Sequence, residues 1–269
     1  MRWMNAACAI RVAGFLLAVG LTWPAIAGPR EDAVTAYSRQ DYATTVRLLK
    51  PLADQGDARA QNLLGSMYTD GQGVPKDDAQ AVKWYRLAAD QGYALAQYNL
   101  GLMYYNGQGV PKDDAQAVKW FRLAADQGDA GAQNNLGLMY DNGRGVPKDD
   151  AQAMKWYRLA ADQGEAKAQA NLGVMYHNGQ GVPKDDAQAV KWLRLAADQG
   201  NAQAQANLGS MYDNGQGVPR DYVLAYMWSN LGAARGSETG RKNRDLIAPR
   251  MTLTDISEAQ RLSREWKPK

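Results

Sequence analysis

A segment of 36 residues recurs through most of this chain, and it restricts the fold more than any other feature of the sequence. The fragment GVPKDDAQAVKW occurs at 73–84, 109–120 and 181–192, and at 145–156 with one change, Met154. A fixed period of this length indicates a repeat architecture in which each unit stacks on the next. Glycine and tryptophan follow the same period, at Gly65, Gly101, Gly137, Gly173 and Gly209 and at Trp84, Trp120, Trp156, Trp192 and Trp228.

Each unit is predicted to be a pair of helices. In the first unit, residues 58–70 have apolar side chains at helical spacing, and Gly71 ends that helix. Asp77 is placed to cap a second helix, with Gln80 three residues later. Gly65 lies in the middle of the first helix, where glycine costs about 1 kcal/mol relative to alanine. We therefore expect two helix backbones to cross closely at this glycine.

Residues 1–27 have the three parts of a secretory signal. Arg2 and Arg11 supply positive charge, residues 12–21 are apolar, and Ala27 ends an A-x-A cleavage site. The apolar run is about half of the roughly 20 residues that a membrane-spanning helix needs. We expect cleavage after Ala27, no membrane insertion afterwards, and a periplasmic or secreted mature protein. A retained membrane anchor is the alternative.

The remaining sequence contains no recognisable catalytic or metal-binding set. The net charge is +3 without a basic run, which argues against nucleic acid as a partner. His177 is the only histidine, and the only cysteine, Cys8, lies in the predicted signal. The loop Gly71-Gln72-Gly73 and its copies lack the Gly-Lys-Ser/Thr that completes a phosphate-binding loop. We expect no catalytic residues, no cofactor and no metal site.

The repeated motif resembles a known family. The pattern A-x-A-Q-x-x-L-G-x-M-Y-x-x-G-x-G-V-P-x-D, then A-x-x-W and A-A-x-x-G, is similar to the Sel-1-like repeat (SLR), a relative of the tetratricopeptide repeat. The resemblance implies an all-α fold, a right-handed α/α superhelical solenoid of tandem 36-residue helix-turn-helix repeats. Residues 28–57 and 238–269 are expected to form N-terminal and C-terminal capping helices. The five matching units are 58–93, 94–129, 130–165, 166–201 and 202–237.

The resemblance also implies where a partner binds. In tetratricopeptide-like solenoids, one face of the first helix lines a concave groove that holds extended peptides. One position on this face is Asn in four of the five units, and an amide suits a peptide backbone because it both donates and accepts. Packing or bridging between neighbouring helices is the alternative for these residues and for the apolar strip beside them. The candidate partner-binding residues are Asn99, Asn135, Asn171, Asn207, Tyr98, Leu102, Tyr105, Leu138, Lys167, Val174 and His177.

We therefore expect a monomeric, non-enzymatic scaffold or adaptor of the bacterial envelope that binds a protein or peptide. Two alternatives stay open. Some exported SLR proteins are linked to β-lactam binding or hydrolysis, but this sequence lacks S-x-x-K, S-D-N and K-T-G motifs and the cysteine pairs of that group. The second alternative is a structural component of the envelope.

Overall fold

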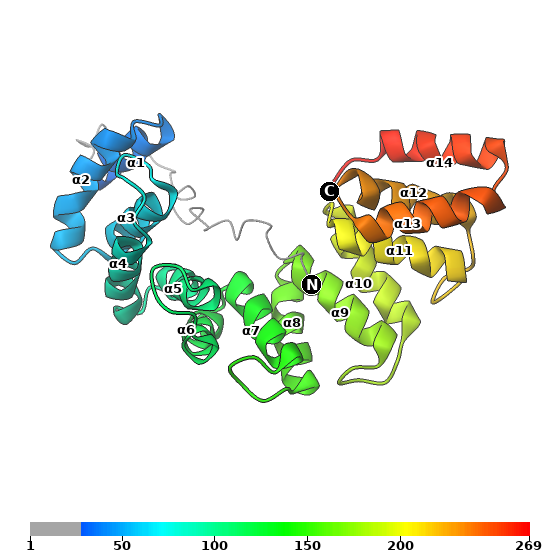
Figure 1. Cartoon of the computed structure of the whole chain (residues 1–269), viewed down its shortest axis with the longest axis horizontal. Coiled ribbons are helices and arrows are strands. Elements are labelled where there is room, and N and C mark those ends of the chain that lie inside the picture. Colours follow the sequence, from blue (N-terminus) through cyan, green and yellow to red (C-terminus); the bar gives the residue numbers. More distant parts are fainter. Residues whose placement is uncertain (1–27) are drawn as a thin grey trace. The chain divides into compact units, whose positions relative to one another are not determined.

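The computed structural model describes residues 28–269, and this part of the chain is built from helices without strands (Figure 1). The prediction of an all-α fold of tandem helix pairs is confirmed; the predicted signal, 1–27, lies outside the described residues. None of the described helices has the length and apolar character needed to cross a membrane. The helices are α1 (Pro29–Ser38), α2 (Tyr42–Asp54), α3 (Ala58–Asp70), α4 (Asp78–Asp90), α5 (Ala94–Asn106), α6 (Asp114–Asp126), α7 (Ala130–Asn142), α8 (Asp150–Asp162), α9 (Ala166–Asn178), α10 (Asp186–Asp198), α11 (Ala202–Asn214), α12 (Tyr222–Ala234), α13 (Glu238–Ile247), the 3-10 turn η1 (Ala248–Arg250) and α14 (Leu253–Glu265).

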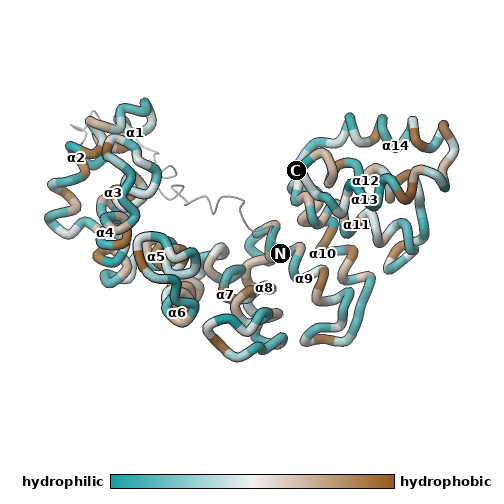
Figure 2. Tube along the Cα trace, in the orientation of Figure 1, coloured by the Kyte–Doolittle hydropathy of each residue, from teal (hydrophilic) through white to brown (hydrophobic). Residues whose placement is uncertain are grey.

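Local signals in each repeat set the ends of its two helices. In the first repeat, the carboxylate of Asp57 accepts from backbone N–H groups at the start of α3, and Gly71 ends α3 with a φ of 69°. Asp77 caps α4 by accepting from the N–H of Gln80. Polar and apolar residues alternate along the chain (Figure 2). The second helix α4 buries one side, whereas the first helix α5 is buried over all of residues 96–103.

The mid-helix glycine makes room for a large side chain of the second helix. A Cβ atom added at Gly65 would lie 2.8 Å from the ring of Tyr85, and one at Gly101 would lie 2.6 Å from the ring of Phe121. Real Cβ contacts are longer than this, so any side chain here would displace the ring. The sequence predicts a close crossing of two helix backbones here, but at Gly65 and Gly101 the close neighbour is an aromatic ring of the second helix.

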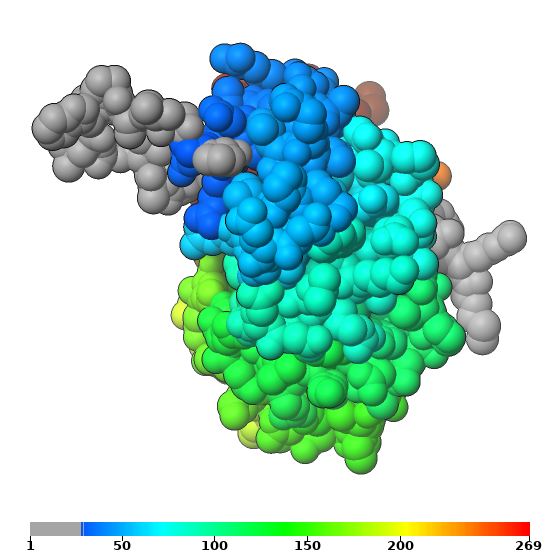
Figure 3. Space-filling model, turned by 90° about the vertical axis from the view of Figure 1, so that its left-hand side faces the viewer, coloured from blue at the N-terminus to red at the C-terminus, as the bar shows by residue number. Residues whose placement is uncertain are grey.

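The described chain divides into two compact units, each with its own stacked helices. The first comprises residues 28–132 and 144–146, and the second comprises residues 133–143 and 147–269. In Figure 3 the blue N-terminal cap of the first unit lies directly on the cyan first repeat. Tryptophans of the repeats are part of both cores. Trp120 is buried in the core of the first unit, and Trp228 is buried in the core of the second.

One glutamine hydrogen bond recurs where a repeat meets its predecessor. Counting each repeat from its first residue, Gln61 at position 4 donates to the carbonyl of Ala53 at 2.9 Å and accepts from Gln91 at 2.8 Å. In the second unit Gln169 donates in the same way to Ala161 at 3.2 Å. Each of these carbonyls also accepts from a backbone N–H just after its helix, Gly56 for Ala53 and Gly164 for Ala161, so the glutamine supplies a second hydrogen bond.

Both caps follow the pattern of the repeats. Asp41 stands 36 residues before Asp77 and caps α2 in the same way. At the other end, Asn243 on α13 donates to the carbonyl of Ala206, 37 residues earlier. Lys269 holds the end of the chain, since its backbone N–H donates to Asp198 at 2.9 Å. The terminal helices are thus divergent helix pairs that cover the ends of the stack.

Replacing Gly101 with alanine tests the close approach. Alanine is the better helix former by about 1 kcal/mol, but the clash with Phe121 should outweigh this gain and cost about 1–3 kcal/mol in total. We expect Gly101→Ala to lower the midpoint of urea unfolding, followed by circular dichroism. In a Phe121→Ala background the same change should be neutral or stabilising. A rise in the midpoint of the single variant would contradict the clash.

Candidate partner-binding face

The candidate residues lie on the first helix of each repeat, at positions 2, 5, 6, 9 and 12. We call the surface that they form the A face. Its second-unit part comprises Asn135, Leu138, Lys167, Asn171, Val174, His177, Asn207 and Ser210. Because these positions are three to four residues apart, they fall on one side of α7, α9 and α11. The first and second units differ in how much of this face reaches solvent.

In the first unit the candidates are largely buried. Asn99 is 1% exposed, and its Nδ2 donates to Oδ1 of Asn62 on the preceding repeat at 3.0 Å. Leu102 is 2% exposed, and the ring of Tyr98 packs against Phe121 with centroids 6.1 Å apart. These three side chains hold neighbouring helices together.

In the second unit the equivalent side chains keep part of their surface. Asn135, Asn171, Leu138 and Val174 are half-buried, while Lys167 is exposed. Asn171 donates to Oδ1 of Asn134 at 3.2 Å, which repeats the bridge of the first unit. Asn171 therefore joins neighbouring helices and also remains partly accessible.

Asn207 differs from Asn99 and Asn171. Its counterpart on the preceding repeat is Ala170, so no amide bridge forms. Its Oδ1 accepts from Gln203 on the same helix at 2.9 Å. Among the described residues the Nδ2 group of Asn207 has no acceptor, and it is available to a carbonyl of a bound partner.

A cluster of polar side chains borders the A face of the first unit. The guanidinium of Arg144 makes two hydrogen bonds to Asp114, at 2.7 and 3.0 Å, and donates to the hydroxyl of Tyr105 at 2.7 Å. It also lies 4.2 Å from the centre of the Tyr105 ring. The hydrogen bonds from Arg144 hold the pKa of Asp114 below its ordinary value. Sequence reasoning missed this pair, although Arg144 is the only repeat residue at position 15 that is not Gln.

His177, which is at position 12 of its repeat as Tyr105 is, belongs to a similar polar cluster in the second unit. Its Nδ1 lies 2.6 Å from Oδ1 of Asp186, and Lys184 lies 3.4 Å from the same carboxylate. Burial opposes ionisation of Asp186, but the contacts with His177 and Lys184 outweigh it and hold the pKa of this carboxyl below its ordinary value. Within residues 28–269, no group of three or more His, Cys, Asp or Glu side chains is placed to hold a metal ion.

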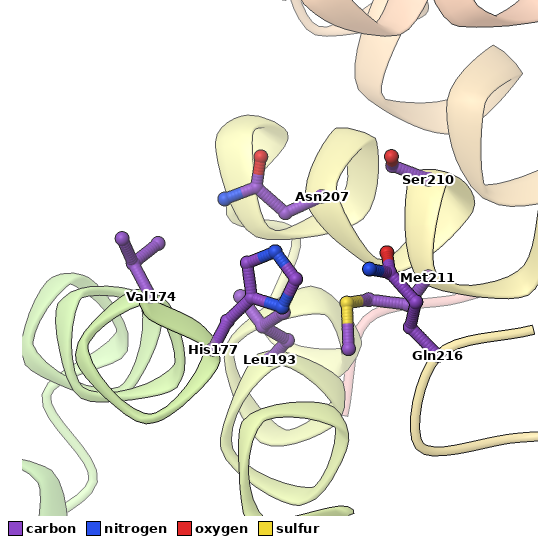
Figure 4. Close-up of a pocket in the computed structure, with 7 residues that line it drawn as sticks. All are labelled: Val174, His177, Leu193, Asn207, Ser210, Met211 and Gln216. Carbon is purple, nitrogen blue, oxygen red and sulfur yellow. The ribbon is translucent and has the colours of Figure 1, made fainter. Parts of the chain in front are cut away.

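The structure brings three of the candidates together in one hollow. Val174 and His177 on α9 and Asn207 on α11 line a cavity of about 180 Å³ within the second unit (Figure 4). In the figure the His177 ring projects from α9 toward α11. The hollow combines apolar surface with amide groups.

Comparison with known proteins agrees with the repeat pattern. The chain is similar to a Sel1 repeat protein from Oxalobacter formigenes, at 34% identity and a TM-score of 0.77, over 90% of this chain and 92% of that chain. The immunity protein Pa5087 from Pseudomonas aeruginosa has a related fold at 19% identity and a TM-score of 0.51, over 78% of this chain and 84% of that one. No curated protein matches the chain. The family model described as Sel1 repeat matches residues 58–93, 94–129, 130–165, 166–201 and 202–237.

Replacing Arg144 with glutamine, the residue of the other repeats, tests the border cluster. A carboxyl with a lowered pKa stabilises the fold above its unfolded pKa of about 3.9, and this contribution is lost as the pH falls through the folded pKa. We expect Arg144→Gln to lower the free energy of unfolding by about 0.5–1 kcal/mol at pH 7. The difference from wild type should shrink below about pH 4.

Tyr105→Phe is the matched control for this experiment. It removes only the hydroxyl that accepts from Arg144 and leaves the pair with Asp114 intact. Its effect on the free energy of unfolding should therefore not change between pH 7 and pH 4. An Arg144→Gln effect that is equally independent of pH would show that Asp114 is not the relevant partner.

Proposed function

This chain belongs to the Sel1 repeat family, and on that premise we propose that it is a non-enzymatic scaffold or adaptor of the bacterial envelope. Proteins of this family are generally scaffolds for protein–protein interaction. The proposed partner is a protein or peptide that binds the A face of the second unit. The amide-rich surface of that face and the differences among its repeats support the proposal.

The single observation that carries the proposal is where the nearly identical repeats differ. Position 2 on the A face has five residue types, and position 12 has four. Position 36, which precedes the next helix, and position 28, in the core, also vary. The glutamine at position 4, the glycines at positions 8 and 14 and the capping aspartate at position 20 are constant in all five repeats, so variation on the A face is free to serve recognition. Position 2 is occupied by Arg59, Leu95, Gly131, Lys167 and Gln203, and position 12 by Thr69, Tyr105, Asp141, His177 and Asp213.

The chemistry of the second-unit A face suits a peptide backbone. Asn135, Asn171 and Asn207 are half-buried amides that recur at the repeat spacing. Each amide offers both a donor and an acceptor, as each peptide unit does. Leu138 and Val174 supply apolar surface beside them, and such a mixture is typical of protein interfaces.

The combined variant Asn135→Ala, Asn171→Ala and Asn207→Ala tests the proposal. The three changes remove amides from the A face, and each lost hydrogen bond costs about 1 kcal/mol, so affinity should fall by about a hundredfold. We expect a protein that residues 28–269 retain from envelope extract to be lost from the variant, while far-ultraviolet circular dichroism is unchanged. Asn99 is left intact because it is buried against Asn62.

The control makes alanine substitutions on the second helices of the repeats instead of the first. Leu159 and Leu195 are exposed on α8 and α10, at 40% and 42%. The variant Leu159→Ala with Leu195→Ala should retain the partner as well as wild type does. Equal retention by the asparagine variant would contradict binding on the A face.

The envelope location is also a proposal, and it rests on residues 1–27. Their charge, short apolar run and A-x-A site are typical of a cleaved secretory signal. We expect the chain recovered from the periplasm or medium to begin at Gly28. Mass spectrometry of the intact protein measures this directly, and a membrane-bound chain that retains residues 1–27 would contradict it.

A further inference from the structure

The hollow in the second unit has a lining that the other repeats do not share. Figure 4 shows its residues converging from α9, from Leu193 on α10 and from α11. Its volume is about 180 Å³. An apolar cavity of about 150 Å³ is large enough to bind benzene, so this space admits a side chain of moderate size. The lining consists of Val174, His177, Leu193, Asn207, Ser210, Met211 and Gln216.

The hollow arises where two large residues of the repeat are replaced by smaller ones. In the first repeat, position 28 is Tyr85, whose hydroxyl reaches within 3.4 Å of Thr69 at position 12. In the second repeat, the Phe121 ring lies 6.4 Å from the ring of Tyr105 at that same position. The fourth repeat has Leu193 instead, which is too short to fill the space beside position 12.

The second replacement lies across the hollow. Position 9 of the fifth repeat is Ser210, where the second and third repeats have leucine. The hydroxyl of Ser210 lies 3.3 Å from Nδ2 of Asn214, from which it accepts. The small side chain leaves the space above Leu193 and Met211 open. Both causes are visible in the sequence, and together they place the hollow at this junction.

The lining favours an uncharged ligand group. Leu193 and Met211 are buried and, with Val174, give the hollow an apolar floor. The nearby charges are already paired: Asp186 contacts His177 and Lys184. Asp213, one turn after Ser210, contacts Arg250 at 3.0 Å. A charged side chain would therefore lose its hydration without meeting an opposite charge.

The rim supplies groups that match a peptide backbone. Nδ2 of Asn207 is a free donor among the described residues. His177 directs Nδ1 to Asp186, so its other ring nitrogen remains for a contact from outside. Gln216 adds a further amide to the lining. An extended peptide presents one carbonyl and one N–H per residue and points alternate side chains to one side.

We propose that this hollow is a specificity pocket for one aliphatic side chain, Leu, Ile, Val or Met, of an extended peptide segment. Asn207 holds the backbone beside it. The inference rests on the proposed function, since it names the side chain of the partner that the A face recognises. The pocket gives the fourth and fifth repeats a selectivity that the other repeats lack, because the first three repeats have an aromatic residue at position 28, where the fourth has Leu193.

A displayed library of random peptides is the probe, selected on residues 28–269. We expect the selected peptides to share one aliphatic position. Changing that residue to alanine should weaken binding to the wild type by roughly ten- to hundredfold, as expected for a buried side chain. Calorimetry with synthetic peptides measures the change.

Two variants close the pocket with residues that the chain already uses elsewhere. Ser210→Leu copies position 9 of the second repeat, and Leu193→Phe copies its position 28, so both should fold. Each variant should bind the selected peptide with an affinity lower than that of the wild type by roughly tenfold or more. In either variant, alanine in place of the aliphatic residue of the peptide should have little further effect. Leu195→Ala, on the exposed side of α10, is the control and should bind normally.

The outcomes separate the pocket from the A face as a whole. Peptides that depend on the three asparagines but bind both filled variants normally would overturn the pocket and leave the proposed function standing. Peptides indifferent to both sets of changes would overturn both. Selection of charged residues at the common position, or of no common sequence, would also overturn the pocket.

Discussion

The hydrogen bond from the position-4 glutamine to the preceding second helix is the contact on which the repeat stack depends. It gives a carbonyl at the end of that helix a second hydrogen bond, as Gln61 does for Ala53, whose carbonyl also accepts from the N–H of Gly56. The glutamine itself is held by a second amide, Gln91 in the first repeat. Where Arg235 replaces that second amide, Oε1 of Gln205 is buried without a hydrogen bond. The array of repeats ends at this place, and the C-terminal cap begins.

Stacking by constant residues leaves the A face free to differ from repeat to repeat. Glycine against a large side chain and glutamine against a carbonyl fix the geometry, and neither uses the A face. In the first unit the A-face side chains contribute to internal packing: Asn99 is hydrogen-bonded to Asn62, and Leu102 is buried. In the second unit, smaller residues such as Val174 and Ser210 leave surface and a hollow. The proposed recognition site therefore lies where the A-face side chains keep part of their surface exposed.

The helix pairs were predictable from sequence because their signals are local. Asp77 and Gly71 mark helix ends within a few residues, and Gly65 predicts a close contact by its position in the helix. The surroundings of the candidate residues were not predictable in this way. Whether Asn99 is buried depends on Asn62, 37 residues earlier, and both identities had to be compared at the helix junction.

The border cluster and the hollow were missed for a related physical reason. The pair of Arg144 with Asp114 joins residues 30 apart, on a loop and a helix of successive repeats. The hollow at Leu193 exists because position 28 of this repeat lacks an aromatic ring. A missing ring does not create a sequence motif that could be recognised. Aligning the repeats with one another exposes both, because each is a departure from an otherwise constant position.

Hydrogen exchange on the complex with the captured partner tests the central claim most directly. The account holds that recognition uses the first helices of the second unit. It predicts that partner binding slows backbone exchange in α9 and α11 and in the loop that contains Gln216, while α8 exchanges as in the free protein. Slowed exchange confined to α8 and α10, on the side of Leu159 and Leu195, would contradict it.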